Sequence, residues 1–170
     1  MANSELRDAM DRLSAVIAAD PAKARMKNVP ATARLTEGLK CEVSGPNKER
    51  ATTDMPPAMG GRLSAPNPSW LLRAGMASCV ATVIAMRAAK LGIALTELEV
   101  TVESDSDARG ILGLDELVSA GLNAMRTRVR IGGDADAQAL RKLVEWADAH
   151  SPVGCTVRSS AACALDVEVI

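Results

Sequence analysis

PNPSWLLRAGMASCVATVIAMRAAKLGI, residues 66–93, is the stretch of this sequence that decides its fold. Asn67 is a good N-cap residue, and Pro68 suits the first helical turn because its missing N–H costs nothing there. The helical pattern continues up to Gly92, which is placed for a left-handed C-cap. These signals predict one long helix over residues 68–91.

The middle of this helix carries no charged residue between Arg73 and Arg87. A helix that is apolar on nearly all sides must be covered by protein on nearly all sides, so we expect it to be buried at the centre of the fold. Cys79 lies in its least polar part, where Ser78 and Thr82 are its polar companions.

Short alternating segments on both sides of the helix predict β-strands. Residues 31–44 are typical of a hairpin, and residues 50–54 of a further short strand. Residues 95–103, 121–131 and 164–170 alternate apolar and polar side chains, which predicts three more strands.

Two amphipathic helices complete the pattern. One covers residues 4–19, and the other covers residues 135–149, with Asp134 as its cap and Trp146 on its buried side. The segment 151–157 is a turn or a short helix. This order of elements predicts an α+β fold in which mostly antiparallel, curved sheets wrap around the buried helix.

Composition limits the classes of function. The chain has 170 residues, the size of one domain, and a net charge of −1 with acids and bases mixed, which argues against a nucleic-acid partner. Its N-terminus lacks a basic segment followed by an apolar run, and the apolar stretch 74–86 is too short to span a bilayer. We therefore expect a cytoplasmic protein with no membrane partner.

Four cysteines and one histidine could carry chemistry: Cys41, Cys79, Cys155, Cys163 and His150. The cysteines are too sparse for a disulfide scaffold and form no CxxC pair, so we expect reduced thiols. We interpret Cys41, Cys163 and His150 as structural. A metal site would depend on the single histidine, so neither a metal nor a bound cofactor is expected.

Cys79 allows two interpretations. Cysteine often packs as a small apolar residue, which needs no reactivity. A reactive thiol would instead need a cationic or hydrogen-bonding neighbour that stabilises the thiolate. The adjacent sequence offers none, so that partner would come from elsewhere, such as Arg34, Arg50, Arg62 or a second subunit.

Four segments resemble the osmotically inducible protein C (OsmC) and organic hydroperoxide resistance superfamily. They are GGRLSAPNPSWLLRAGMASCVATVIAMRAAKLGI, LTELEVTVESDSDARGILGLDEL, NAMRTRVRI and AHSPVGCTVRSSAACALDVEV. The resemblance covers roughly residues 29–170 and leaves residues 1–28 as an N-terminal helix and connector. It implies the OsmC-like fold and an intertwined homodimer whose sites lie between subunits.

The resemblance also implies a thiol peroxidase that acts on organic hydroperoxides. Cys79 would be the peroxidatic thiol, Arg34 its thiolate partner, and a dithiol or low-molecular-weight thiol the external reductant. Similar active members carry the resolving cysteine where this chain has Ser151, and the hydroperoxide-resistance branch carries a glutamate where this chain has Ser69. Cys155 is then the candidate resolving thiol.

Three functions remain open at this point. The first is the two-cysteine peroxidase, and the second is a single-cysteine peroxidase that is resolved by an outside thiol. The third is a non-enzymatic dimer whose apolar pocket binds a hydrophobic molecule.

Overall fold

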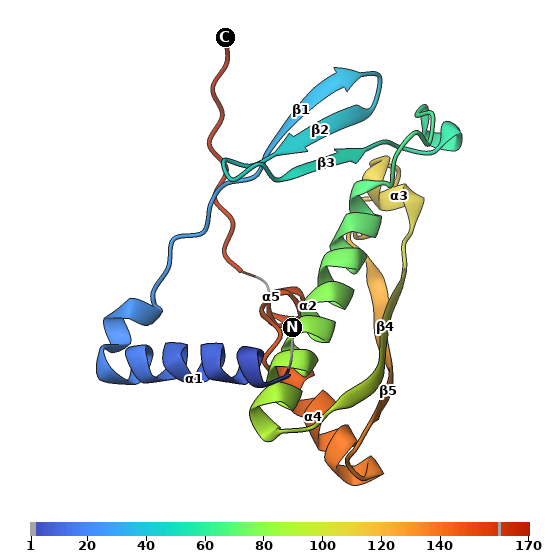
Figure 1. Ribbon diagram of the computed structural model, residues 1–170. Helices are drawn as coiled ribbons and strands as arrows, with labels where there is room; N and C mark the ends of the chain where they lie inside the picture. Colours follow the sequence, from blue (N-terminus) through green and yellow to red (C-terminus); the bar gives the residue numbers. More distant parts are fainter. Residues whose placement is uncertain (1–2, 160) are drawn as a thin grey trace. The chain divides into compact units, whose positions relative to one another are not determined.

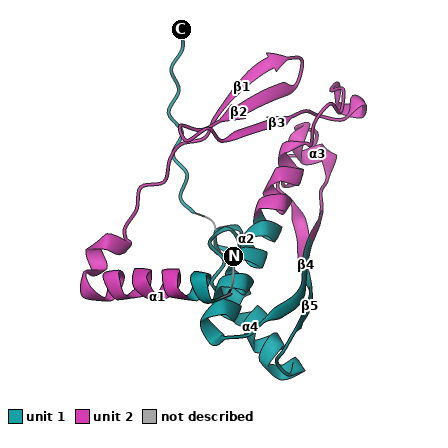
Figure 2. Cartoon of the chain, in the orientation of Figure 1, with its two compact units in different colours: residues 1–7, 76–101, 127–170 teal, residues 8–75, 102–126 magenta. Residues whose placement is uncertain are grey.

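A computed structural model describes residues 3–159 and 161–170 of the chain, which divides into two compact units (Figures 1 and 2). Unit 1 comprises residues 1–7, 76–101 and 127–170, and unit 2 comprises residues 8–75 and 102–126. Each unit has its own internal organisation and is described by itself.

The long helix α2 spans Pro68–Leu91, as the sequence predicts. The Oδ1 atom of Asn67 accepts a hydrogen bond from the N–H of Trp70 at 2.8 Å, which confirms the N-cap. At the other end Gly92 has φ 76°, and the N–H groups of Gly92 and Ile93 donate to the carbonyls of Ala89 and Ala88. This is a Schellman motif, which satisfies carbonyls that the helix end would otherwise leave unpaired.

The core of unit 1 forms where α2 meets α4, which spans Ala137–Ala149. Two strands, β4 (Leu95–Asp105) and β5 (Asn123–Gly133), pair with each other in a two-stranded sheet (Figure 1). Their alternating apolar side chains face the core, as predicted. The buried core residues are Val80, Ile84, Ala88, Leu143 and Ala147, and Leu98, Val100, Val129 and Ile131 are among those that pack against them.

Two further helices, α1 and α5, are the first and last helices of the described residues. α1 spans Asn3–Ala19, in agreement with the sequence pattern, and α5 spans Pro152–Arg158. A 3₁₀ turn, η1 (Pro21–Ala24), follows α1. Within unit 1 the Nε of Arg7 donates to the carbonyl of Ala89, which ties the start of α1 to the end of α2.

Unit 2 contains a three-stranded antiparallel sheet in the order β1-β2-β3. The strands are β1 (Thr32–Glu37), β2 (Lys40–Ser44) and β3 (Arg50–Thr53), which confirms the predicted hairpin and third strand. A 3₁₀ turn, η2 (Pro57–Met59), lies in the following loop, and the short helix α3 spans Ala108–Ile111.

Burial of α2 differs from the expectation. Four of its five buried residues, Met76, Val80, Ile84 and Ala88, follow one face, while Ser78 and Thr82 are exposed. The single chain therefore does not cover the helix on nearly all sides. By length and composition α2 is long and apolar enough to cross a membrane, although the core helix of a soluble protein meets the same criterion.

Three local expectations are wrong. Asp136, not Asp134, caps α4 and accepts from the N–H of Ala139, because Asp134 instead accepts from the N–H of Ala94 at 2.7 Å. Residues 164–170 form no strand, since they pair with no other strand in the chain as described. Trp146 is 37% exposed instead of buried, and the guanidinium of Arg87 covers one face of its ring.

Candidate functional site

Cys79 and Ser151 meet within unit 1, although they are 72 residues apart in the sequence. The Ser151 hydroxyl donates a hydrogen bond to the Cys79 Sγ at 3.2 Å. Cys79 is half-buried on α2, whereas Ser151 is fully buried at the start of α5. The sulfur therefore has the hydrogen-bonding neighbour that the adjacent sequence lacks.

Local backbone geometry fixes the position of Ser151. It is the N-cap of α5, and its Oγ accepts from the N–H of Gly154 at 3.2 Å. Its carbonyl accepts from the N–H of Cys155 at 2.8 Å, and its own N–H donates to the carbonyl of Asp148. A serine followed by a proline is a recognised start of a helix, so this role of Ser151 could have been predicted, but its contact with Cys79 could not.

Cys155 lies one helical turn beyond Ser151 and is half-buried. Its thiol donates to the carbonyl of Ala149 at 3.2 Å, and the Nη2 of Arg158 lies 3.6 Å from its sulfur. Arg158 also forms a salt bridge with Asp148 at 3.1 Å. Cys155 thus has a polar, partly cationic environment, and its role as the resolving thiol stays a prediction.

His150 belongs to a stacked arrangement with Trp146 and Arg87. The imidazole stacks on the indole of Trp146 with ring centroids 3.9 Å apart, and the guanidinium of Arg87 lies 4.4 Å from the indole centroid. The Nδ1 of His150 donates to the carbonyl of Trp146 at 2.7 Å, since a carbonyl only accepts. Both interactions engage Trp146, which supports the structural interpretation of His150.

Arg34 lies in unit 2, on β1, opposite Glu42 of β2. A hollow of about 460 Å³ in this sheet is lined by Arg34, Glu42, Val43, Ser44, Arg50, Ala51 and Thr52. The role of Arg34 as a thiolate partner stays a prediction.

Asp54 organises the loop that follows β3. Asp54 is 2% exposed as a residue, and its carboxylate accepts from the N–H groups of Met55, Arg62 and Ser64 and from the Ser64 hydroxyl. The N–H of Ser64, helped by the other donors, holds the pKa of Asp54 below its ordinary value, although burial acts in the opposite direction. A Cβ at Gly61 would collide with the carbonyl of Met55, so this glycine serves the loop geometry.

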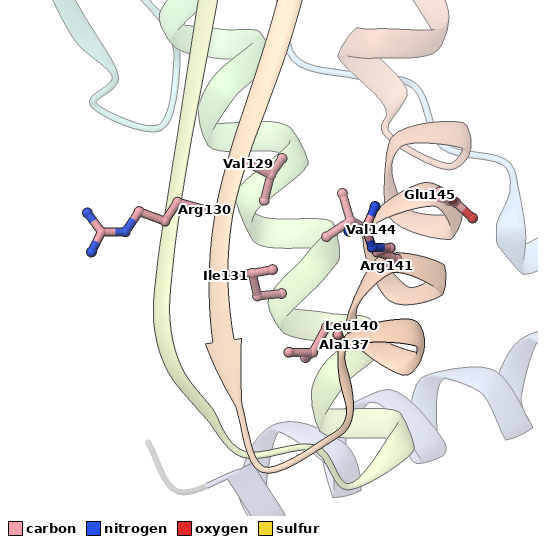
Figure 3. A pocket seen from close by; sticks show the side chains of 8 residues that line it. All are labelled: Val129, Arg130, Ile131, Ala137, Leu140, Arg141, Val144 and Glu145. Carbon is pink, nitrogen blue, oxygen red and sulfur yellow. The ribbon is translucent and has the colours of Figure 1, made fainter.

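A groove of about 590 Å³ lies between β5 and α4 in unit 1 (Figure 3). Its lining is mainly apolar and comprises Val129, Arg130, Ile131, Ala137, Leu140, Arg141, Val144 and Glu145, of which Arg130 points away from α4. It contains no cysteine or histidine. Within residues 3–159 and 161–170, no group of three or more histidine, cysteine or acidic residues could hold a metal ion.

Comparison with solved structures places this fold among known proteins. An OsmC-like protein from Mycoplasma pneumoniae superposes with a TM-score of 0.67 at 17% sequence identity, over 80% of this chain and 91% of that one. An organic hydroperoxide resistance protein from Elizabethkingia anophelis gives a TM-score of 0.63 at 22% identity, over 80% and 91%. An organic hydroperoxide resistance protein OsmC from Legionella pneumophila gives a TM-score of 0.59 at 20% sequence identity, over 79% of this chain and 92% of that one. These identities support a shared fold and nothing finer.

The sequence itself carries the family assignment. No curated protein matches the chain significantly. The family model described as OsmC-like protein matches residues 60–166, which is more than half of the chain and includes both Cys79 and Ser151. The chain therefore belongs to the OsmC-like protein family.

Proposed function

We propose that this protein reduces organic hydroperoxides, with Cys79 as the attacking thiol. The observation that carries the proposal is the half-buried Cys79 sulfur on α2, held by a hydrogen bond from the buried hydroxyl of Ser151. Membership of the OsmC-like family supports it, as do two proteins of the same fold that are described as organic hydroperoxide resistance proteins.

In the proposed reaction the Cys79 thiolate attacks the outer oxygen of the hydroperoxide ROOH. A sulfur–oxygen bond forms while the O–O bond breaks, so the sulfur is oxidised to a sulfenic acid and the peroxide is reduced. The leaving alkoxide takes up a proton and departs as the alcohol ROH. We expect the apolar side chains of α2 near Cys79 to favour an alkyl peroxide over hydrogen peroxide.

Regeneration of the thiol needs a second sulfur. Either Cys155 condenses with the sulfenic acid to give a disulfide, or an external dithiol or low-molecular-weight thiol does so. In both cases an external thiol supplies the electrons, and the proposal requires no bound cofactor.

We also propose that the active form is a homodimer. Residues 161–170 are exposed along their whole length, and Leu165, Val167 and Val169 alternate with acidic residues. An extended segment with an exposed apolar side is a liability for a single chain, because it pairs readily with another chain. A second subunit is the partner that the family resemblance favours.

Peroxide consumption in single-cysteine variants tests the proposed activity. The substrate is tert-butyl hydroperoxide and the reductant is dithiothreitol. We expect Cys79→Ser to consume peroxide no faster than the mixture without protein does, because the variant lacks the nucleophile. Cys41→Ser, a matched change in unit 2, should keep the wild-type rate. Unchanged turnover in Cys79→Ser would eliminate the proposed activity.

The groove beside β5 favours a second candidate, a non-enzymatic protein that binds a hydrophobic molecule. Its mainly apolar lining and its volume of about 590 Å³ are typical of ligand pockets. Native mass spectrometry of the purified protein separates the two candidates. A bound apolar ligand together with an unreactive Cys79 would favour the binding protein, whereas a reactive Cys79 supports the peroxidase.

A further inference from the structure

We propose that Ser151 is a positioning residue for Cys79, and that it makes the oxidised Cys79 depend on an external thiol for its reduction. This inference rests on the proposed peroxidase function and specifies how that site works. It assigns a chemical role to a serine at the position where the family resemblance implies a resolving thiol.

The first step of the argument is the fixed direction of the Ser151 hydroxyl. Its oxygen accepts the N–H of Gly154, and this contact is part of the N-cap of α5. The hydroxyl hydrogen then points to the Cys79 sulfur, 3.2 Å from the oxygen. Because Ser151 is fully buried, water does not compete for this hydrogen bond.

The second step concerns charge on the sulfur. Cys79 attacks peroxide as a thiolate, and a hydrogen bond donated to an ionised group is stronger than one between neutral groups. The Ser151 hydroxyl therefore stabilises the attacking form and holds the sulfur in one place. The described structure gives Cys79 this hydroxyl as a side-chain hydrogen-bond donor.

The third step is that the Ser151 hydroxyl cannot form a disulfide with Cys79. A sulfenic acid at Cys79 forms a disulfide only with a thiol, and the side chain that faces the sulfur is an alcohol. Cys155 is held elsewhere in its local structure. Its backbone N–H bonds to the Ser151 carbonyl and its thiol bonds to the Ala149 carbonyl, so attack by Cys155 would require its thiol to leave the Ala149 carbonyl.

The resulting reaction balances with an external thiol RSH. Cys79 sulfenic acid and RSH give a mixed disulfide, Cys79–S–S–R, and water. A second RSH attacks this disulfide, which releases RSSR and restores the Cys79 thiol. The two electrons come from the two external thiols.

Four proteins test the inference: the wild type, Ser151→Cys, Ser151→Ala and Ser151→Thr. Each is oxidised with one equivalent of tert-butyl hydroperoxide in the presence of dimedone, and its cysteines are identified by peptide mass spectrometry. We expect a dimedone adduct on Cys79 in the wild type and a mixed disulfide when glutathione replaces dimedone. Ser151→Cys should instead give a disulfide between positions 79 and 151, because the new sulfur faces Cys79 directly.

The rate at which peroxide oxidises Cys79 measures the contribution of the hydrogen bond from Ser151. Ser151→Ala should oxidise about tenfold or more slowly, since it loses a hydrogen bond to a charged group. Ser151→Thr keeps the hydroxyl and should recover most of the rate. Thermal melting of each variant reports folding, and the disulfide in Ser151→Cys tests the geometry independently of the stability of the alanine variant.

Three results would overturn the inference while leaving the peroxidase intact. These are a Cys79–Cys155 disulfide in the wild type, oxidation of Ser151→Cys without a 79–151 disulfide, and a wild-type oxidation rate in folded Ser151→Ala. Failure of Cys79 to oxidise in every protein would be a different outcome, because it removes the proposed function and the inference with it.

Discussion

The side chains that matter most for stability and for chemistry lie on different faces of one helix. Ile84 and Val80 are fully buried against α4, whereas Cys79, beside Val80, is half-buried and reaches the hydroxyl of Ser151. In an α-helix, consecutive residues are rotated by about 100° around the helix axis. One residue can therefore pack in the core while the next reaches a partly exposed site. Stability and reactivity can therefore be changed separately.

Replacement of a core residue that does not touch the Cys79 thiol should lower the free energy of unfolding. Ile84→Ala removes a fully buried side chain, so we expect the free energy of unfolding to fall by about 2–5 kcal/mol. Thr82→Ala on the exposed face should change it by about 0.5 kcal/mol or less. Urea denaturation followed by circular dichroism measures both changes, and equal losses would contradict this assignment of the core.

Single-residue chemistry was only partly predictable from the sequence. Cys79 could be chosen because it lies in an apolar helix within a recognisable motif. Its partner could not, since periodicity and capping are local and the Cys79–Ser151 contact joins positions 72 residues apart. The same limit left Arg34 as a candidate on resemblance alone.

At the scale of elements, the boundaries that depend on local signals were the most predictable. The Asn67 N-cap and the Gly92 turn place the two ends of α2 at the residues that the sequence predicts, 68 and 91. The cap of α4 was assigned to the wrong residue, because Asp134 and Asp136 both suit an N-cap. A long-range bond from the N–H of Ala94 to Asp134 decides between them.

The loop after β3 should make stability depend on pH. The pKa of Asp54 is lowered in the folded state, chiefly by the N–H of Ser64. The stabilisation is thus fully present above the ordinary aspartate pKa of about 3.9 and is lost as the pH falls through the lower, folded value. Asp54→Asn should have a lower melting temperature than the wild type at pH 7.

Melting temperatures between pH 7 and pH 2 check this account of Asp54. The difference in melting temperature between the wild type and Asp54→Asn should become smaller as the pH falls, because the wild-type carboxylate becomes protonated. The exposed Asp166, which has no role in this loop, provides a control as Asp166→Asn. A constant difference over the whole range would show that the charge of Asp54 does not stabilise the loop.

At the scale of the whole molecule, α2 and the C-terminal segment have apolar surface that the single chain leaves exposed. The predicted complete burial of α2 and the predicted strand 164–170 both depend on partners that local sequence does not specify. Alternation shows that a segment can be a strand, but a strand forms only where another strand supplies its hydrogen bonds. The fold class was therefore predictable, while the surroundings of these two segments were not.

Dimerisation should depend on the apolar side of residues 161–170. We expect the wild type to have a molar mass of twice 17.7 kDa by light scattering after gel filtration. Replacing Leu165, Val167 and Val169 by serine should increase the monomer fraction, because these exposed side chains would lose their apolar contact with the partner. A matched variant with Asp166→Asn and Glu168→Gln should stay dimeric. A wild type that is monomeric at micromolar concentration would contradict the dimer.

The central claim is that Cys79, among the four cysteines, is the thiol that meets the peroxide. Its most direct test is to treat the wild-type protein with less than one equivalent of tert-butyl hydroperoxide and to measure the oxidised fraction of Cys41, Cys79, Cys155 and Cys163 by peptide mass spectrometry. The account predicts that oxidation appears first at Cys79 while the other three remain reduced. Earlier oxidation at any other cysteine, with Cys79 still reduced, would contradict it.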